Sequence, residues 1–171
     1  MIELSVIRDL VGIFGVIAGF TYYVLTVRNA QRNQQHQLET RQAQLFMQIY
    51  DNFNKTEFYR KFMEVVQLME WNDVEDYDIK YGDVLEDHSK TSSLGVFFEG
   101  IGVLAQQELI DVKLVARLMS SNLRAYWEKT GPIWKARRER SGNPYIMEYN
   151  EWLYNAVKRV KQEQKPAYLM E

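Results

Sequence analysis

Glu99 is the residue whose surroundings most suggest chemistry, because this acid lies among the apolar residues Phe97, Phe98 and Ile101. Burial raises the pKa of a carboxyl group unless a cation lies beside it. The candidate cations are Arg124, Arg137 and Arg138. We expect a structural buried ion pair, with a general acid as the alternative, since ion pairs shift pKa values as active sites do.

A basic segment late in the chain is the second candidate, and its cations are Lys135, Arg137, Arg138 and Arg140. Trp134 lies beside them. Such a segment could contact phosphates or anionic lipid head groups. The alternative is the solvated face of a short helix, because four charges are few.

Residues 72–87 form an acidic stretch that could attract a hard cation such as Ca²⁺. Its spacing does not fit an EF-hand, because a loop begun at Asp76 would have Lys80 at its fifth position and Tyr81 where glycine is required. The stretch also lacks helical periodicity. We therefore predict a long solvated surface loop and no metal site.

Other catalytic chemistry has little material in this sequence. The chain has no cysteine, and its two histidines, His36 and His88, are not spaced as zinc ligands. No phosphate-binding glycine loop or dinucleotide motif is present. We expect no catalytic residues and no cofactor, and the aromatic residues late in the chain are expected in the core.

The composition is that of a globular protein with room for one domain and an anchor. The chain has 171 residues, of which 46% are hydrophobic and 26% charged, and its formal net charge is −2. This balance excludes strongly basic and disordered classes, so nucleic acid is an unlikely partner.

Residues 10–27 are an uncharged apolar run of 18 residues, which predicts a membrane-spanning helix. At 1.5 Å per residue it would reach about 27 Å, close to the thickness of a bilayer core. A cleaved signal peptide is disfavoured, because no basic cluster precedes the run. Arg8 lies before it and Arg28, Arg32 and Arg41 after it, so the positive-inside rule places the C-terminal domain in the cytoplasm of a single-pass protein of the cell membrane.

Three glycines in this run, Gly12, Gly15 and Gly19, could form a packing face. Gly15 and Gly19 make a G-x-x-x-G pair, which lets two membrane helices approach closely. The sequence therefore allows a homo-oligomer, although glycine is also simply common in membrane helices.

The pattern predicts an all-α fold in which the transmembrane helix continues into a stalk, followed by a bundle of about four to five helices. No glycine or proline occurs between Gly19 and Gly82, so nothing stops the first helix early. We divide the chain into an anchor (1–28), a polar helical stalk (29–50), a bundle domain (51–165) and a tail (166–171).

Helical periodicity and start signals place the helices of the bundle. One helix is capped by Asn54 and ends near residue 71, and another resumes after Ser89, where its glycines suggest close helix contact. Asp111 is expected to cap a helix that stops at residues 130–132. A short helix through Arg140 and a last helix opened by Pro144 complete the prediction.

The second half of the chain resembles an uncharacterised prokaryotic family of membrane-anchored helical domains, a domain of unknown function numbered 4760. The resemblance rests on residues between Leu94 and Leu153, namely Phe97-Phe98-Glu99 with Gly102, Leu109-Ile110-Asp111, Trp127 followed by Pro132, Arg137 or Arg138, and Tyr149 with Leu153. The sequence departs from the pattern at Glu108, where glycine is expected. The resemblance implies a fold and a topology but no activity.

Two classes of function remain open. The first is a membrane-tethered interaction or scaffold module that contacts the bilayer through residues 10–27 and binds a protein partner that the sequence does not identify. The second is a small membrane-anchored sensor or enzyme that uses a pocket lined by Glu99, or the acidic loop. We favour the first, because no catalytic constellation is recognisable.

Overall fold

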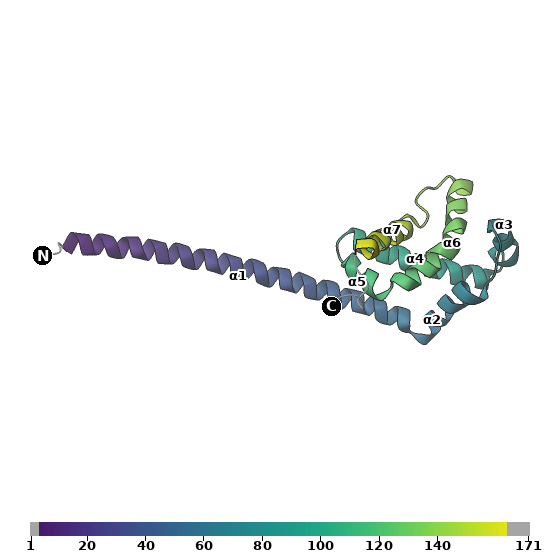
Figure 1. The fold of residues 1–171 in the computed structure, drawn as a ribbon, viewed down its shortest axis with the longest axis horizontal. Coiled ribbons are helices and arrows are strands. Elements are labelled where there is room, and N and C mark those ends of the chain that lie inside the picture. Colours follow the sequence, from purple (N-terminus) through teal and green to yellow (C-terminus); the bar gives the residue numbers. More distant parts are fainter. Residues whose placement is uncertain (1–3, 164–171) are drawn as a thin grey trace. The chain divides into compact units, whose positions relative to one another are not determined.

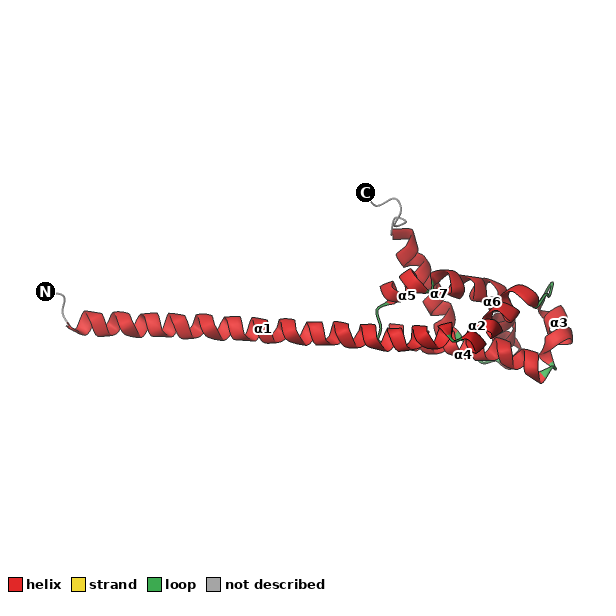
Figure 2. Ribbon diagram, turned by 90° about the horizontal axis from the view of Figure 1, so that it is seen from below, coloured by secondary structure: helices red, strands yellow, loops and turns green. Residues whose placement is uncertain are grey.

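The computed structural model describes residues 4–163, which form an ordered series of helices (Figure 1). In chain order these are α1 (Leu4–Asn54), α2 (Thr56–Met63), η1 (Glu64–Leu68), α3 (Val74–Tyr77), η2 (Asp78–Gly82), α4 (Leu85–Gln106), α5 (Val112–Leu118), α6 (Ser120–Ser141) and α7 (Glu148–Glu163). The elements η1 and η2 are π-helical. No strand occurs in the described range, so the all-α prediction is confirmed (Figure 2).

The chain divides into two compact units, Met1–Arg41 and Gln42–Glu171. Helix α1 passes through this boundary without a break, as the absence of glycine and proline predicted. The second unit begins before the end of the predicted stalk at residue 50, because Phe46 and Phe53 are fully buried. The predicted tail, 166–171, lies outside the described residues.

The core of the second unit is built around α4, which packs against α7, η2 and α2. One face of α4 is apolar and fully or almost fully buried, with Leu94, Phe98, Ile101 and Ala105 at helical spacing. Gly102 lies on this buried face, and a Cβ atom there would stand 2.2 Å from the carbonyl oxygen of Tyr149. The close helix contact expected from the glycines of this segment is therefore present between α4 and α7.

The acidic stretch 72–87 is not the long loop that its charge predicted, because it holds α3 and η2. Asp73 caps α3 by accepting a hydrogen bond from the backbone N–H of Asp76 (2.8 Å). Tyr77 then inserts into the core and is fully buried, with its ring 5.0 Å from that of Trp71. The fully buried Tyr77, with the partly buried Tyr81 beside it, therefore packs this acidic segment against the core.

Five predicted helix boundaries were wrong. The N-cap position of α2 is Lys55, which makes no capping hydrogen bond, rather than Asn54. Helix α4 begins at Leu85, α7 begins at Glu148 rather than at Pro144, and the helix predicted from Asp111 breaks at Met119 into α5 and α6. Helix α6 also passes through Pro132, although an interior proline costs about 3 kcal/mol. Packing outweighs that cost, since buried residues lie on both sides of the proline, at Tyr126 and Trp127 before it and at Ile133 and Trp134 after it.

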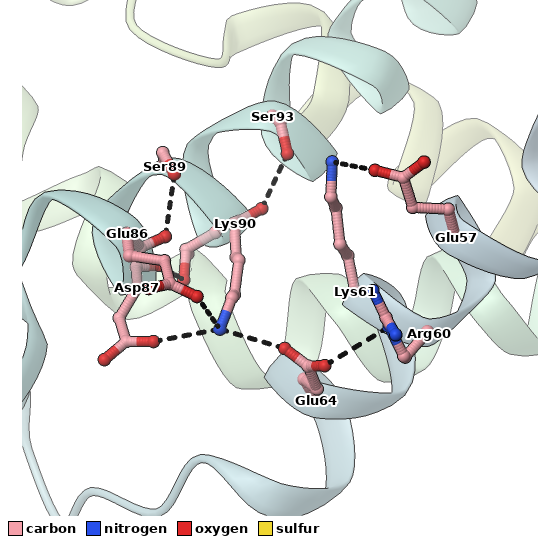
Figure 3. A network of polar contacts seen from close by, with 10 residues as sticks. Glu57, Arg60, Lys61, Glu64, Glu86, Asp87, Ser89, Lys90 and Ser93 are labelled. Carbon is pink, nitrogen blue, oxygen red and sulfur yellow. Dashed lines mark hydrogen bonds and ion pairs between the residues drawn. The ribbon is translucent and has the colours of Figure 1, made fainter.

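Lys90 is the centre of an ion-pair network that joins η1 to the first turns of α4 (Figure 3). Its ammonium lies 3.0 Å from Glu64, 3.3 Å from Glu86 and 3.2 Å from Asp87. The hydrogen bonds from Lys90 to these carboxylates raise the pKa of the lysine. Since the Lys90 side chain is four-fifths shielded from solvent, water screens these ion pairs less than those on an open surface, and the network stabilises the contact between η1 and α4.

Lys129 on α6 binds backbone carbonyl groups at the end of η1. Its ammonium donates hydrogen bonds to the carbonyl oxygens of Val66 (2.9 Å) and Met69, and it lies 4.7 Å from the centre of the Trp71 ring. Burial lowers the pKa of this lysine. Carbonyl groups at the end of a helix lack hydrogen-bond donors within the helix. Lys129, from another part of the chain, provides the donor for these carbonyl groups.

Glu108 adopts a left-handed backbone conformation, with φ of 57°. This is the position where the resemblance predicted glycine, and glycine is the residue that adopts such a conformation without a steric penalty. The Glu108 side chain is exposed, so its loss should remove little packing.

We expect Glu108→Gly to raise the free energy of unfolding by roughly 0.5–1 kcal/mol, because relief of the left-handed strain exceeds the entropy that glycine adds to the unfolded chain. Chemical denaturation followed by tryptophan fluorescence measures this change. Gln107→Gly is the control, since φ is −82° at that residue and glycine there should only destabilise. Equal losses of stability in both variants would contradict the strain at Glu108.

Candidate functional site

A groove between α6 and α7 is the candidate site in the second unit. Its volume is about 560 Å³, and it is lined by Ser120, Ser121, Leu123, Arg124, Glu128, Tyr154, Val157, Lys158, Lys161 and Gln162. Residues three or four apart on a helix share a face, so Ser120, Arg124 and Glu128 form one stripe along α6. Tyr154, Lys158 and Lys161 form the facing stripe along α7, and the buried Leu123 and Val157 form an apolar floor.

Glu128 organises one end of this groove. Its Oε1 accepts hydrogen bonds from Nε of Arg124 (2.8 Å) and from the hydroxyl of Tyr154 (3.1 Å). The bond from Arg124 lowers the pKa of the Glu128 carboxyl group, with a smaller contribution from Tyr154. The carboxylate therefore stays ionised and holds the arginine and the tyrosine in place.

The two lysines of the groove make no direct ion pair among the described residues, although the charge of Lys158 helps to lower the pKa of Glu128. Within the described residues no ion pair engages Lys158 or Lys161, and Lys158 lies 5.9 Å from the centre of the Tyr154 ring. The hydroxyl groups of Ser120 and Ser121 likewise make no hydrogen bond within residues 4–163. The groove thus offers several free donors and an excess of positive charge.

Among the described residues no arginine lies within ion-pair distance of Glu99, although the charge of Arg138 acts to lower its pKa. Its carboxylate instead accepts a hydrogen bond from the backbone N–H of Asn150 (2.7 Å), in the first turn of α7. Burial raises the pKa of Glu99, and the backbone N–H groups of Asn150 and Tyr149 partly oppose this shift. Because the first N–H groups of a helix lack partners within the helix, Glu99 acts as a cap supplied from α4.

Arg138, one of the three candidate partners of Glu99, fastens the segment that leads into α7. It donates to the carbonyl oxygens of Ile146 (2.6 Å) and Met147 (2.9 Å), and it pairs with Glu151. Lys135 reaches the same Glu151 carboxylate at 3.0 Å. Burial favours the neutral form of Glu151, but the hydrogen bonds from Arg138 and Lys135 prevail and lower its pKa.

The other basic candidates are also engaged by neighbouring side chains. The guanidinium of Arg137 lies 3.1 and 3.3 Å from the two ring nitrogens of His88, and burial together with this cation lowers the pKa of the histidine. Arg140 pairs with Glu75 (3.0 Å) and with Asp78. The predicted lipid-contact segment therefore has most of its charge bound within the domain.

Of the sequence candidates, only Arg124 lines the groove. Sequence reasoning named it as a partner for Glu99 and missed Ser120, Tyr154, Lys158 and Lys161. Their i, i+4 spacing was a usable signal, but which helix faces which is a property of the fold. Gly12, Gly15 and Gly19 lie on α1, and a Cβ atom added to any of them would meet no described atom within 4 Å, so that face is open.

The profile of a domain of unknown function, DUF4760, matches residues 10–157 of the sequence. The chain belongs to this family. No curated protein and no solved structure matches it. Two of the residues that suggested the family, Glu99 and Gly102 of α4, contact the start of α7 in this DUF4760 domain, where a third, Tyr149, lies.

The groove is distinct from that meeting point. Its α6 stripe lies inside the range matched to DUF4760, whereas Lys158 and Lys161 follow the end of the match at residue 157. The family assignment therefore does not by itself assign a role to the groove.

Proposed function

We propose that this DUF4760 protein is a membrane-tethered helical interaction module. The observation that carries the proposal is the apolar part of α1, which is long and apolar enough to cross a membrane and has none of its side chains buried. Large apolar residues are exposed on every side of this segment, for example Val11 (67%), Val16 (74%) and Ile17 (55%). Such exposure is unfavourable in water and favourable in a bilayer.

The charges beside this segment support an orientation. Arg28, Arg32 and Arg41 follow it, and Arg8 precedes it. By the positive-inside rule the second unit lies in the cytoplasm. The open glycine face of Gly12, Gly15 and Gly19 would allow two anchors to pair, and pairing would bring two copies of the second unit together.

A ligand sensor is the second candidate function, and the groove between α6 and α7 favours it. A groove of about 560 Å³ lies within the range of sites for small molecules. Glu99 does not support the enzyme alternative, because its carboxylate is already used to cap α7.

Two arginines in the middle of the apolar segment should release the protein from membranes. Val16→Arg together with Phe20→Arg is expected to cost roughly 5–7 kcal/mol of insertion free energy, since one arginine at the centre of a span costs about 2.5–3.5 kcal/mol. The wild-type protein should stay in the membrane pellet after alkaline extraction, and the double variant should not.

The matched control is Gln31→Arg with Gln35→Arg, which adds the same charge to the polar part of α1. This variant should remain in the pellet. Extraction of the wild-type protein into the soluble fraction would overturn the proposed anchor.

Since the chain has no cysteine, Asn155→Cys gives one labelling site, which a membrane-impermeant maleimide should reach only in permeabilised cells.

A further inference from the structure

We propose that the groove between α6 and α7 binds a phosphate ester, either free in solution or as the head group of a lipid. The groove is formed by residues of the second unit alone, so this proposal does not depend on the membrane anchor.

The charge balance of the groove is the first argument. Arg124, Lys158 and Lys161 contribute three positive charges, and Glu128 contributes one negative charge that is already bonded to Arg124. Cations that line one groove repel one another unless an anion lies between them. An anionic ligand would remove this repulsion.

Other basic side chains of the same unit show the contrast. Arg138 and Lys135 share Glu151, Arg140 has Glu75 and Asp78, and Lys90 has three carboxylates. These cations hold elements of the fold together. Within the described residues Lys158 and Lys161 form no ion pair that joins two elements; Lys158 acts on Glu128 only at longer range and lies 5.9 Å from the centre of the Tyr154 ring.

The chemistry of the donors points to phosphate. Arg124 uses Nε to bond Glu128, and its two terminal nitrogens make no hydrogen bond within residues 4–163. A guanidinium presents such paired donors in the geometry that phosphate oxygens accept. The hydroxyl groups of Ser120 and Ser121 add neutral donors beside it, and the apolar floor of Leu123 and Val157 reduces competition from water.

The position of Glu128 indicates which end of the groove the phosphate should occupy. Because this carboxylate repels anions, the phosphate should lie toward Ser120 and Lys161, away from the Glu128–Tyr154 hydrogen bond. Glu128 and Tyr154 are then positioning residues that hold Arg124 and close the groove.

The test uses the full chain in nanodiscs of phosphatidylcholine, titrated with glycerol 3-phosphate as the free phosphate ester. All four tryptophans lie in the second unit, so their fluorescence reports its thermal unfolding. Glycerol 3-phosphate should raise the unfolding midpoint, because a ligand that binds the folded state stabilises it. In Lys158→Gln with Lys161→Gln the ligand should bind about tenfold more weakly or worse.

Lys55→Gln with Lys61→Gln is the matched control, since it removes the same charge from α2 and its N-cap and should leave binding unchanged. Misfolding of the groove variant would be visible as a lower midpoint without ligand. We expect its midpoint without ligand to stay close to that of the wild type, because both lysine side chains are exposed and form no ion pair among the described residues.

A second set of nanodiscs contains phosphatidic acid, which carries the same phosphate chemistry on a lipid. A midpoint shift with glycerol 3-phosphate identifies a free ligand, and a shift only with phosphatidic acid identifies a lipid head group, provided that the groove variant loses it. The proposal is overturned if neither compound shifts the wild-type midpoint, or if the groove variant and the control respond like the wild type.

Discussion

Gly102→Ala is expected to lower the free energy of unfolding of the second unit by about 3 kcal/mol or more. The added Cβ would stand 2.2 Å from the carbonyl oxygen and 2.6 Å from the carbonyl carbon of Tyr149. These are backbone atoms at the start of α7, so no rotamer change can relieve the contact. Helices α4 and α7 would have to separate, and Glu99 would lose its hydrogen bond to Asn150.

Gly100→Ala is the matched control, two residues away on the same helix. A Cβ at Gly100 meets no atom within 4 Å, and alanine is the better helix former by about 0.5–1 kcal/mol. This variant should therefore be more stable than the wild type. Chemical denaturation of both variants measures the difference, and similar stabilities for the two would contradict the close approach of α4 and α7.

Gly95→Ala should change the free energy of unfolding by an amount between those of Gly100→Ala and Gly102→Ala. Its added Cβ would meet the end of the flexible Met147 side chain at 2.8 Å and the hydroxyl of Tyr126 at 2.9 Å. The methionine can move, so the penalty is smaller than at Gly102. The stability cost of alanine at these three glycines thus depends on the atoms that face each position, which the sequence does not show.

The class of the fold could be predicted because its signal is local. The spacing of Leu94, Phe98, Ile101 and Ala105 is that of a buried helical face, and these residues are buried. Asp111 was predicted as a cap, and it accepts a hydrogen bond from the N–H of Lys113 (2.8 Å). Such features depend on residues a few positions apart.

The wrong predictions of local structure arose where contacts between residues far apart in the sequence determine the conformation. Tyr77 holds an acidic segment in place through burial among residues such as Trp71, and buried aromatic residues keep α6 helical through Pro132. Charge and proline content favoured a loop and a stop at these positions. Tertiary packing overrode both local preferences.

The candidate site was partly predictable for the same reason. Glu99 was singled out because apolar neighbours would bury it; the residue is partly buried, and this burial raises its pKa. Its partner could not be identified, because the N–H groups that it caps lie about fifty residues further on in α7. The groove was missed entirely, since its two stripes become one site only when α6 and α7 face each other.

Phe53→Ala is the second variant for which we expect a large loss, about 3–5 kcal/mol of the free energy of unfolding. Phe53 lies in the last turn of α1 and is fully buried in the second unit. Its ring centre is 5.3 to 6.1 Å from those of five other aromatic residues, Phe58, Tyr59, Phe62, Phe97 and Phe98. Removal of this ring leaves a cavity and breaks several aromatic contacts at once.

The same variant should destabilise the second unit without affecting membrane anchoring. Residues 10–27 belong to the other compact unit, so Phe53→Ala should remain in the membrane pellet while its second unit becomes sensitive to limited proteolysis. Met47→Ala, a change at a partly exposed position of the same helix, should alter neither property. A Phe53→Ala protein that resisted proteolysis like the wild type would show that the end of α1 does not stabilise the second unit.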